Sequence, residues 1–164
     1  MTAQLLPNHR QPPSALPGFT LIELLVTISL TLLLVGGAVG FASFNNRQQL
    51  IAAAKQVQSV MTTARTKARA GDRPSGCGRL LGYQVTAAAG TSSLTLTADC
   101  SSTDIVDSTT QLNEKVAFDA ALDITFRVLH GGVNAPATIT LSHGTDQYQF
   151  TVSAGGEISE GGLL

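Results

Sequence analysis

The chain has 164 residues, 43% of them hydrophobic, and a formal net charge of −1, which suits one globular domain with an appended segment. A single stretch is apolar over the length of a membrane-spanning helix, which excludes a protein with several membrane spans. Charge is uneven: residues 47–79 hold seven Lys and Arg against Asp72 alone, and residues 80–164 hold two against nine acids. This asymmetry fits either solvated faces or a basic segment of one copy meeting the acidic body of another.

Residues 1–18 are polar and rich in proline. The residue before each proline is pushed away from helical backbone angles, so we expect this segment to be extended and easily cut. It ends at Gly18, immediately before Phe19.

The following stretch, residues 16–44, contains one charged residue, Glu23. Residues 24–46 carry no charge, and 23 such residues are enough to cross a hydrocarbon core of ~30 Å as a helix. An acid at the centre of a membrane helix costs roughly 2.5–3.5 kcal/mol. We therefore expect Glu23 to have a partner or a function; the alternative is an acid that reaches out to the membrane edge.

The run GFTLIELLV, which starts at Gly18, and the aliphatic residues up to about Phe44 resemble the processing site of type IV prepilins and type II secretion pseudopilins. The resemblance implies that a membrane-embedded prepilin peptidase cuts between Gly18 and Phe19 and N-methylates Phe19. It implies that Glu23 then neutralises the new amine at Phe19, within a chain on one helix face and between chains as helices stack into a filament.

The same resemblance implies the partners and the location of the protein. The partners are the prepilin peptidase/methyltransferase, other pilin or pseudopilin subunits through the N-terminal helix, and an inner-membrane assembly platform. The protein would be single-pass in the inner membrane with an exported head, and later part of an extracytoplasmic filament. No cofactor is implied. The competing hypothesis is a secretory signal cleaved after Ala42, which would release a secreted protein, but the apolar run is long for such a signal and begins with an acid.

Gly36, Gly37 and Gly40 interrupt the apolar helix, and their small-xxx-small spacing is suited to close packing between helices. Beyond it, apolar residues recur at spacings of three and four, which predicts an amphipathic continuation that ends at Gly71 and Pro74. This stripe comprises Leu50, Ala54, Val57, Met61, Ala64 and Ala68. One helix is thus expected from Phe19 to Ala70.

From Leu80 onward, alternating β-branched residues predict six short strands, in one antiparallel sheet or two small ones. These strands are residues 80–86, 93–98, 115–119, 122–129, 137–142 and 147–153. The expected fold is α+β, the pilin fold, with a long helix packed on a β-rich head. Its parts are a leader over 1–18, a transmembrane and assembly segment over 19–45, an amphipathic half over 46–71 and a head over 72–164. The runs RTKARAGDRPSGC and YQFTVSAGGEIS resemble minor pseudopilins of the GspH/FimT type.

The two cysteines, Cys77 and Cys100, are predicted to form a disulfide, because an even count in an exported domain favours pairing. Reduced thiols, or a zinc site that adds His130 and His143, are weaker alternatives. No catalytic constellation and no metal site is predicted. The interpretation is a non-enzymatic minor pilin or pseudopilin, in a type IV pilus or a type II secretion pseudopilus.

The alternative function is a DNA-binding or adhesive minor pilin involved in DNA uptake, to which a basic cluster would contribute. The cluster comprises Arg65, Lys67, Arg69, Arg73 and Arg79. Nucleic acid is not favoured as a partner, because the cluster has no interleaved aromatic residues and the C-terminal run GGEISEGGLL has no arginine.

Overall fold

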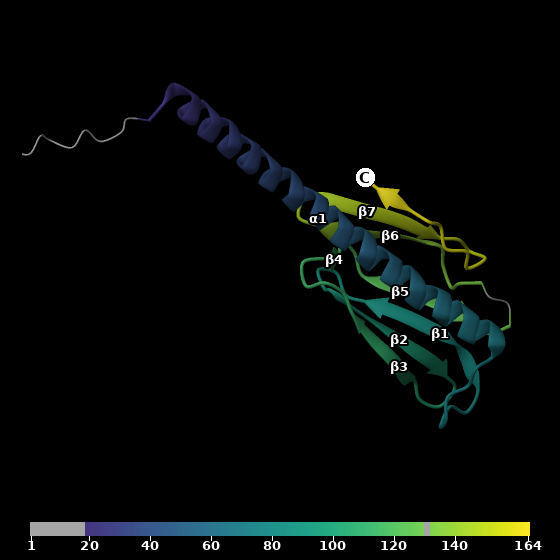
Figure 1. Cartoon of the computed structure of the whole chain (residues 1–164). Coiled ribbons are helices and arrows are strands. Elements are labelled where there is room, and N and C mark those ends of the chain that lie inside the picture. The colour runs from purple at the N-terminus through teal and green to yellow at the C-terminus, as the bar shows by residue number, and fades with distance from the viewer. Residues whose placement is uncertain (1–18, 130–131) are drawn as a thin grey trace, which may run out of the picture. The chain divides into compact units, whose positions relative to one another are not determined.

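The structure is a computed structural model that describes residues 19–129 and 132–164, without the side chains of residues 36–43 (Figure 1). Two compact units are distinguished, residues 1–40 and residues 41–164. We describe each unit by itself and call the second unit the head. The fold is α+β, as predicted.

The helix α1 (Leu21–Ala70) has a defined end at each side. At its C-terminus, Gly71 has a left-handed φ of 64°. The Gly71 amide donates to the Ala68 carbonyl (3.2 Å), and the Asp72 amide donates to the Lys67 carbonyl (3.0 Å). This is the Schellman arrangement, which satisfies the last helical carbonyls and favours glycine at this position because it has no Cβ.

The predicted apolar stripe is confirmed. All six of its residues are fully buried, and Ala53 joins them. Ala64 and Ala68 are small, so the helix backbone can lie close to the sheets. The amphipathic half of α1 is therefore one wall of the hydrophobic core, as its periodicity indicated.

In residues 19–129 and 132–164, eight strands form two antiparallel four-stranded sheets. The first has the order β3-β2-β1-β5 and comprises β1 (Leu80–Ala87), β2 (Ser93–Cys100), β3 (Ile105–Gln111) and β5 (Leu122–Arg127). The second has the order β4-β6-β7-β8 and comprises β4 (Ala117–Phe118), β6 (Ala137–His143), β7 (Asp146–Val152) and β8 (Gly162–Leu163). Within the head, α1 contacts both sheets: Gln56 donates to the carbonyl of Gln111, the last residue of β3, and Gln58 donates to the carbonyl of Ser159, three residues before β8.

The strand predictions hold for five of the six segments and need three corrections. Of the strand predicted over 115–119, only the two residues of β4 are a strand. Val116 belongs to a turn instead, in which its amide donates to the Asn113 carbonyl. The strand β3 was missed because its residues are almost all exposed, so no apolar alternation marks them. The strand β8 was missed because it has two residues and both are exposed.

Among the described residues, no helical stretch combines the length and the apolar character that a membrane span requires. The predicted packing glycines Gly36, Gly37 and Gly40 fall within α1, but their surroundings lie outside the description. The leader, including Gly18, also lies outside the described residues.

Candidate processing and assembly site

The N-terminus of α1 is capped by Thr20, a role that the sequence interpretation did not assign. The Glu23 amide donates to the Thr20 hydroxyl oxygen (3.3 Å), and the Leu24 amide donates to the Thr20 carbonyl (3.2 Å). Thr-x-x-Glu is the sequence signature of a capping box, and the described residues form one half of it: the N-cap side chain accepts from the third helical amide, without a bond from the Glu23 carboxylate back to the Thr20 amide. The pattern was readable in the run FTLIE and explains why the helix begins at Leu21.

The helix begins two residues later than predicted, because Phe19 and Thr20 precede its first residue, Leu21. Glu23 lies in the first turn of α1, where the partial positive charge of the helix N-terminus favours a carboxylate. The pairing of Glu23 with the amine at Phe19, within one chain and between chains, stays a prediction.

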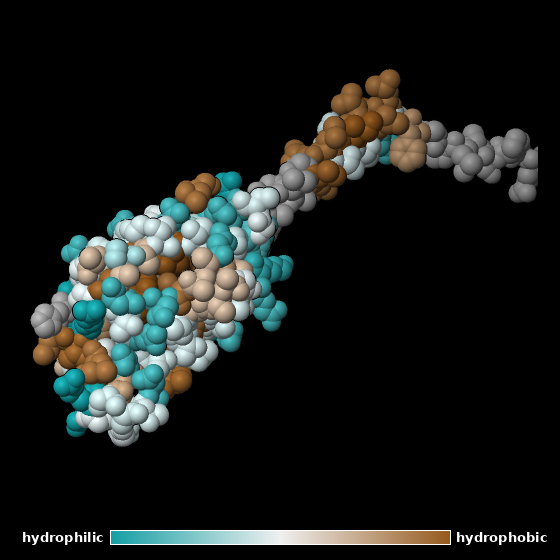
Figure 2. All heavy atoms as spheres, turned by 180° about the vertical axis from the view of Figure 1, so that it is seen from behind, coloured by the Kyte–Doolittle hydropathy of each residue, from teal (hydrophilic) through white to brown (hydrophobic). Residues whose placement is uncertain are grey.

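The first part of α1 exposes apolar side chains on all sides. Every described residue from Phe19 to Val35 is exposed, including Phe19 at 80%, Leu21 at 81% and Leu33 at 76%. Figure 2 shows this stretch as predominantly hydrophobic. A helix that is apolar all round is stable in lipid or among other helices, and large exposed apolar surfaces mark interaction sites.

The hydroxyl groups in this stretch are already satisfied by their own helix. Thr27 donates to the Leu24 carbonyl (2.9 Å), Ser29 to the Leu25 carbonyl (2.8 Å), and Thr31 to the Thr27 and Ile28 carbonyls (2.8 and 2.9 Å). A hydrogen bond of this kind, from a side chain to a carbonyl of its own helix, satisfies the hydroxyl so that it can lie in an apolar medium. In contrast, the Glu23 carboxylate forms no hydrogen bond or ion pair with another described residue. It is the one side chain of this stretch that still requires a polar partner.

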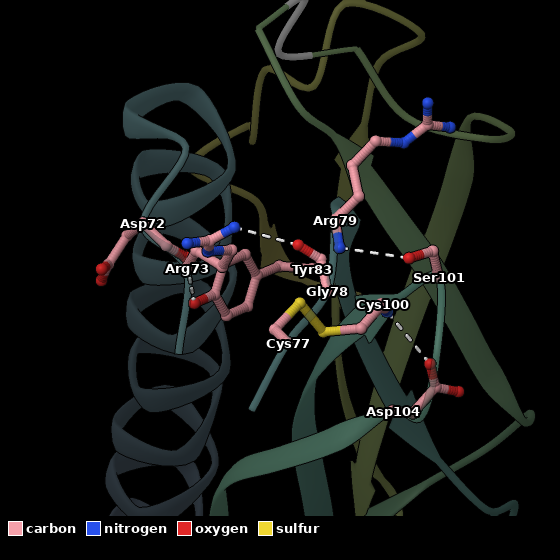
Figure 3. Close-up of a disulfide and its surroundings, with 9 residues drawn as sticks. All are labelled: Asp72, Arg73, Cys77, Gly78, Arg79, Tyr83, Cys100, Ser101 and Asp104. Carbon is pink, nitrogen blue, oxygen red and sulfur yellow. Dashed lines mark hydrogen bonds between the residues drawn. A yellow bond between two sulfur atoms is a disulfide. The ribbon is translucent and has the colours of Figure 1, made fainter. Parts of the chain in front are cut away.

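The predicted disulfide is present in the head. Cys77 and Cys100 are bridged and both are buried, at 6% and 7% exposure. Figure 3 shows that the bridge joins the loop after α1 to the end of β2, beside four hydrogen bonds, one of which is donated by the Arg79 amide to the Ser101 hydroxyl (3.1 Å). Arg73 donates to the Gly78 carbonyl (3.0 Å), the Tyr83 hydroxyl donates to the Asp72 carbonyl (2.8 Å), and the Cys100 amide donates to Asp104 (3.1 Å). The helix-exit loop is therefore held by the disulfide and by hydrogen bonds.

A charged cluster fixes the last turns of α1 to the first sheet. The Lys67 Nζ lies 2.7 and 2.8 Å from the two carboxylate oxygens of Asp107 and 5.6 Å from the centre of the Tyr83 ring. The hydrogen bond to Asp107 raises the pKa of Lys67 despite partial burial. Burial raises the pKa of the Tyr83 hydroxyl. Both shifts favour the protonated forms, a cationic lysine and a neutral tyrosine.

The basic cluster considered for nucleic acid is partly occupied by contacts within the chain. Lys67 is bound to Asp107 and Arg73 to the Gly78 carbonyl. Arg47, at the other end of the amphipathic half, pairs with Asp146 (3.3 Å). The predicted complementarity between the basic helix and the acidic body is thus met in part inside one copy.

The described residues contain no group of three or more His, Cys, Asp or Glu side chains placed to hold a metal ion. His143, predicted to lie in a turn, is instead the last residue of β6 and is buried at 7% exposure. Neither of its ring nitrogens has a hydrogen-bond partner among the described residues. Its predicted zinc partner His130 lies outside the described residues, and both cysteines are in the disulfide.

These features define an α+β protein with an acid in the first turn of an uncovered apolar helix and a disulfide-linked β-rich head. Residues 17–39 match the family described as the prokaryotic N-terminal methylation motif. As the sequence predicted, this match supports the type IV pilin and pseudopilin superfamily; it does not support the narrower GspH/FimT type. Comparison with curated proteins found no match, and comparison with solved structures found none.

Proposed function

We propose that this protein is a filament subunit, a minor pilin or pseudopilin, that is cut after Gly18, methylated at Phe19 and assembled through α1. The observation that carries the proposal is the surface of residues 19–35. Its apolar side chains are exposed, its hydroxyls are satisfied internally, and the Glu23 carboxylate alone needs a partner. Before assembly, lipid of the inner membrane covers this surface, and in the filament the helices of other subunits cover it.

The charge of Glu23 explains why cleavage at Gly18 comes before assembly. An acid at the centre of a membrane helix costs roughly 2.5–3.5 kcal/mol, which is an upper bound for Glu23 in the first turn of α1. Cleavage creates a cationic amine at Phe19, and methylation leaves that charge in place. At ~4 Å and an effective dielectric constant near 20, the attraction between the amine and a carboxylate is about 4 kcal/mol. The amine of one subunit therefore offsets the cost of the Glu23 of the next subunit, and the pair drives addition of subunits. The role is mechanical rather than enzymatic.

Mass spectrometry of the membrane-extracted protein tests the processing step. The expected mature chain begins with methylated Phe19. A bulky residue in place of Gly18, as in Gly18→Leu, should leave the leader attached. A mature chain that retains residues 1–18 in cells with an active prepilin peptidase would overturn the proposal, and a mature chain beginning at Ser43 would instead identify a secreted protein.

Glu23→Ala and Glu23→Gln test the assembly step. Both variants should be processed like the wild type and yet be absent from sheared filaments. Glu157→Ala is the matched control, because Glu157 is also an exposed acid but lies in the head. Normal incorporation of the Glu23 variants would show that the amine–carboxylate pair does not drive assembly.

A further inference from the structure

A pocket in the head lies between α1, β7 and the residues that lead into β8. It has a volume of about 390 Å³ and is lined by Lys55, Gln58, Tyr148, Glu160 and Gly161. Pockets that bind small ligands have volumes of roughly 300–1,000 Å³, so this pocket has room for a small molecule. It contains none of the residues of the processing and assembly site, and the proposed function gives it no role.

The walls of the pocket are fixed by hydrogen bonds and close packing. The Gln58 side-chain amide donates to the Ser159 and Glu160 carbonyls (both 2.8 Å), and the Tyr148 hydroxyl donates to the Glu160 carbonyl (2.6 Å). Gly161 has a left-handed φ of 74°, and a Cβ on it would lie 2.9 Å from the Tyr148 Cε1. The turn from Ser159 to Gly161 is therefore held against α1 and β7 without the help of a ligand.

Two opposite charges line this pocket, and each is exposed. The ion pairs within the described part of the chain are Arg47–Asp146 and Lys67–Asp107, so Lys55 and Glu160 are not paired with each other. Lys55 precedes Gln58 by one helical turn, and Gln58 holds the Glu160 carbonyl. Both charges are thus positioned at one pocket by the same contact between α1 and the turn before β8.

The other polar groups of the pocket are largely used within the chain. The Tyr148 hydroxyl and the Gln58 side-chain nitrogen donate to carbonyls. The groups that are left for a ligand are an ammonium, a carboxylate and the Gln58 side-chain oxygen, beside the ring of Tyr148. A simple anion would be repelled by Glu160 and a simple cation by Lys55, so the lining suits a molecule that carries both charges.

We propose that this pocket binds a small zwitterion in which a short carbon chain joins a primary ammonium to a carboxylate or a phosphate. The ammonium of the ligand donates to the Glu160 carboxylate and the Gln58 side-chain oxygen, and the anionic group binds Lys55. The carbon chain lies against the Tyr148 ring. Free amino acids, phosphorylated amines and the head group of phosphatidylethanolamine share this chemistry. The site belongs to the head alone and does not depend on the proposed filament role.

Ligand-observed NMR titrations of the full-length protein in a nonionic detergent test the site, with O-phosphoethanolamine and β-alanine as probes. Ethanolamine and inorganic phosphate are the matched control ligands, because each carries only one of the two charges. Each should bind about fivefold more weakly than O-phosphoethanolamine. Binding of neither probe, or binding of ethanolamine or phosphate as tightly as the zwitterion, would overturn the proposal.

Substitutions of the two charged residues provide a second test. Lys55→Gln and Glu160→Gln should each weaken the binding of O-phosphoethanolamine about fivefold. The combination of Lys55→Glu and Glu160→Lys should restore it, because both charges are still present. Lys115→Gln and Glu114→Gln are the matched controls, since both residues are exposed in the head and lie outside the pocket. Equal affinity of the pocket variants and these controls would show that the pocket is not the binding site.

Nanodiscs distinguish a lipid head group from a free zwitterion as the source of the ligand. If O-phosphoethanolamine binds in phosphatidylglycerol nanodiscs and fails to bind in phosphatidylethanolamine nanodiscs, the lipid head group occupies the pocket. If it binds equally in both, the ligand is a free zwitterion. Either result supports the site. These measurements need no filament, so their outcome leaves the proposed function to its own tests.

Discussion

The disulfide allows a quantitative prediction for the stability of the head. We consider the double substitution Cys77→Ala and Cys100→Ala, which removes the bridge. The bridge closes a loop with a sequence separation of 23 residues, and the chain-entropy relation then gives a stabilisation of about 3.4 kcal/mol at 25 °C. The physical origin is the unfolded chain, which gains conformational freedom when the bridge is absent.

The folded state should survive this change with little rearrangement. The helix-exit loop remains attached by the Schellman turn at Gly71, by the Tyr83 hydroxyl on the Asp72 carbonyl and by Arg73 on the Gly78 carbonyl. The predicted loss is therefore mainly the loop-closure term, with a smaller contribution from the packing of two buried sulfur atoms. For a domain of this size, about 3.4 kcal/mol corresponds to a decrease in melting temperature of roughly 10–15 °C.

Thermal unfolding of the full-length protein in detergent, followed by circular dichroism, provides the measurement. The wild type with reductant should approach the double variant, and the double variant should not respond to reductant. If the variant melts within about 3 °C of the wild type, corresponding to less than about 1 kcal/mol, the loop-entropy reasoning is refuted. If reductant leaves the wild type unchanged even after prior unfolding, the cysteines are not bridged in the protein.

Three further substitutions have expected outcomes in pH-resolved melting experiments. Lys67→Met should lower the free energy of unfolding by about 1–2 kcal/mol at neutral pH. Because the folded-state pKa of Lys67 lies above 10.5, its contribution to stability is present below pH 10.5 and is lost as the pH rises through the folded pKa. An equal cost of the substitution at higher pH would contradict this role. Asp99→Asn should stabilise the head at neutral pH, because burial, and to a smaller extent the charge of Asp104, raise the pKa of Asp99 above 3.8. The wild type therefore loses stability as the pH rises from 3.8 through the folded pKa. The stability gained by the substitution should vanish below pH 3.8. His143→Leu should stabilise by about 1 kcal/mol, because it removes two buried ring nitrogens without partners; a loss would show that His143 has a polar partner in solution.

A substitution at Gly161 tests the position of β8. Gly161 has a φ of 74°, and an added Cβ would lie 2.5 Å from the Gln149 carbonyl oxygen and 2.6 Å from the Phe150 Cβ. Gly161→Ala should therefore detach β8 and cost about 1–3 kcal/mol. Gly162→Ala is the matched control, because nothing lies within 4 Å of its added Cβ, and equal stability of the two variants would contradict the placement of β8.

The sequence by itself determined those features that depend on local pattern. A periodicity or a composition within a few residues was enough to predict the helix up to Ala70, its buried stripe, five strands and the cysteine pair. The expectation that Glu23 needs a partner also comes from local sequence, since one carboxylate in an apolar run requires a polar partner wherever that run lies. The Thr-x-x-Glu capping signature at Thr20 was also present in the sequence and was not recognised.

Tertiary structure decided what depends on neighbours distant in the chain. The exposed strand β3 and the two-residue β8 exist because β2 and β7 offer free edges, and no side-chain pattern marks them. Lys67 and Asp107 are 40 residues apart, and Leu81, Ala68 and Leu129 come together only because β1, the end of α1 and the β5 exit adjoin. Such contacts arise from the packing of whole helices and strands, so they cannot be predicted from the periodicity of the sequence.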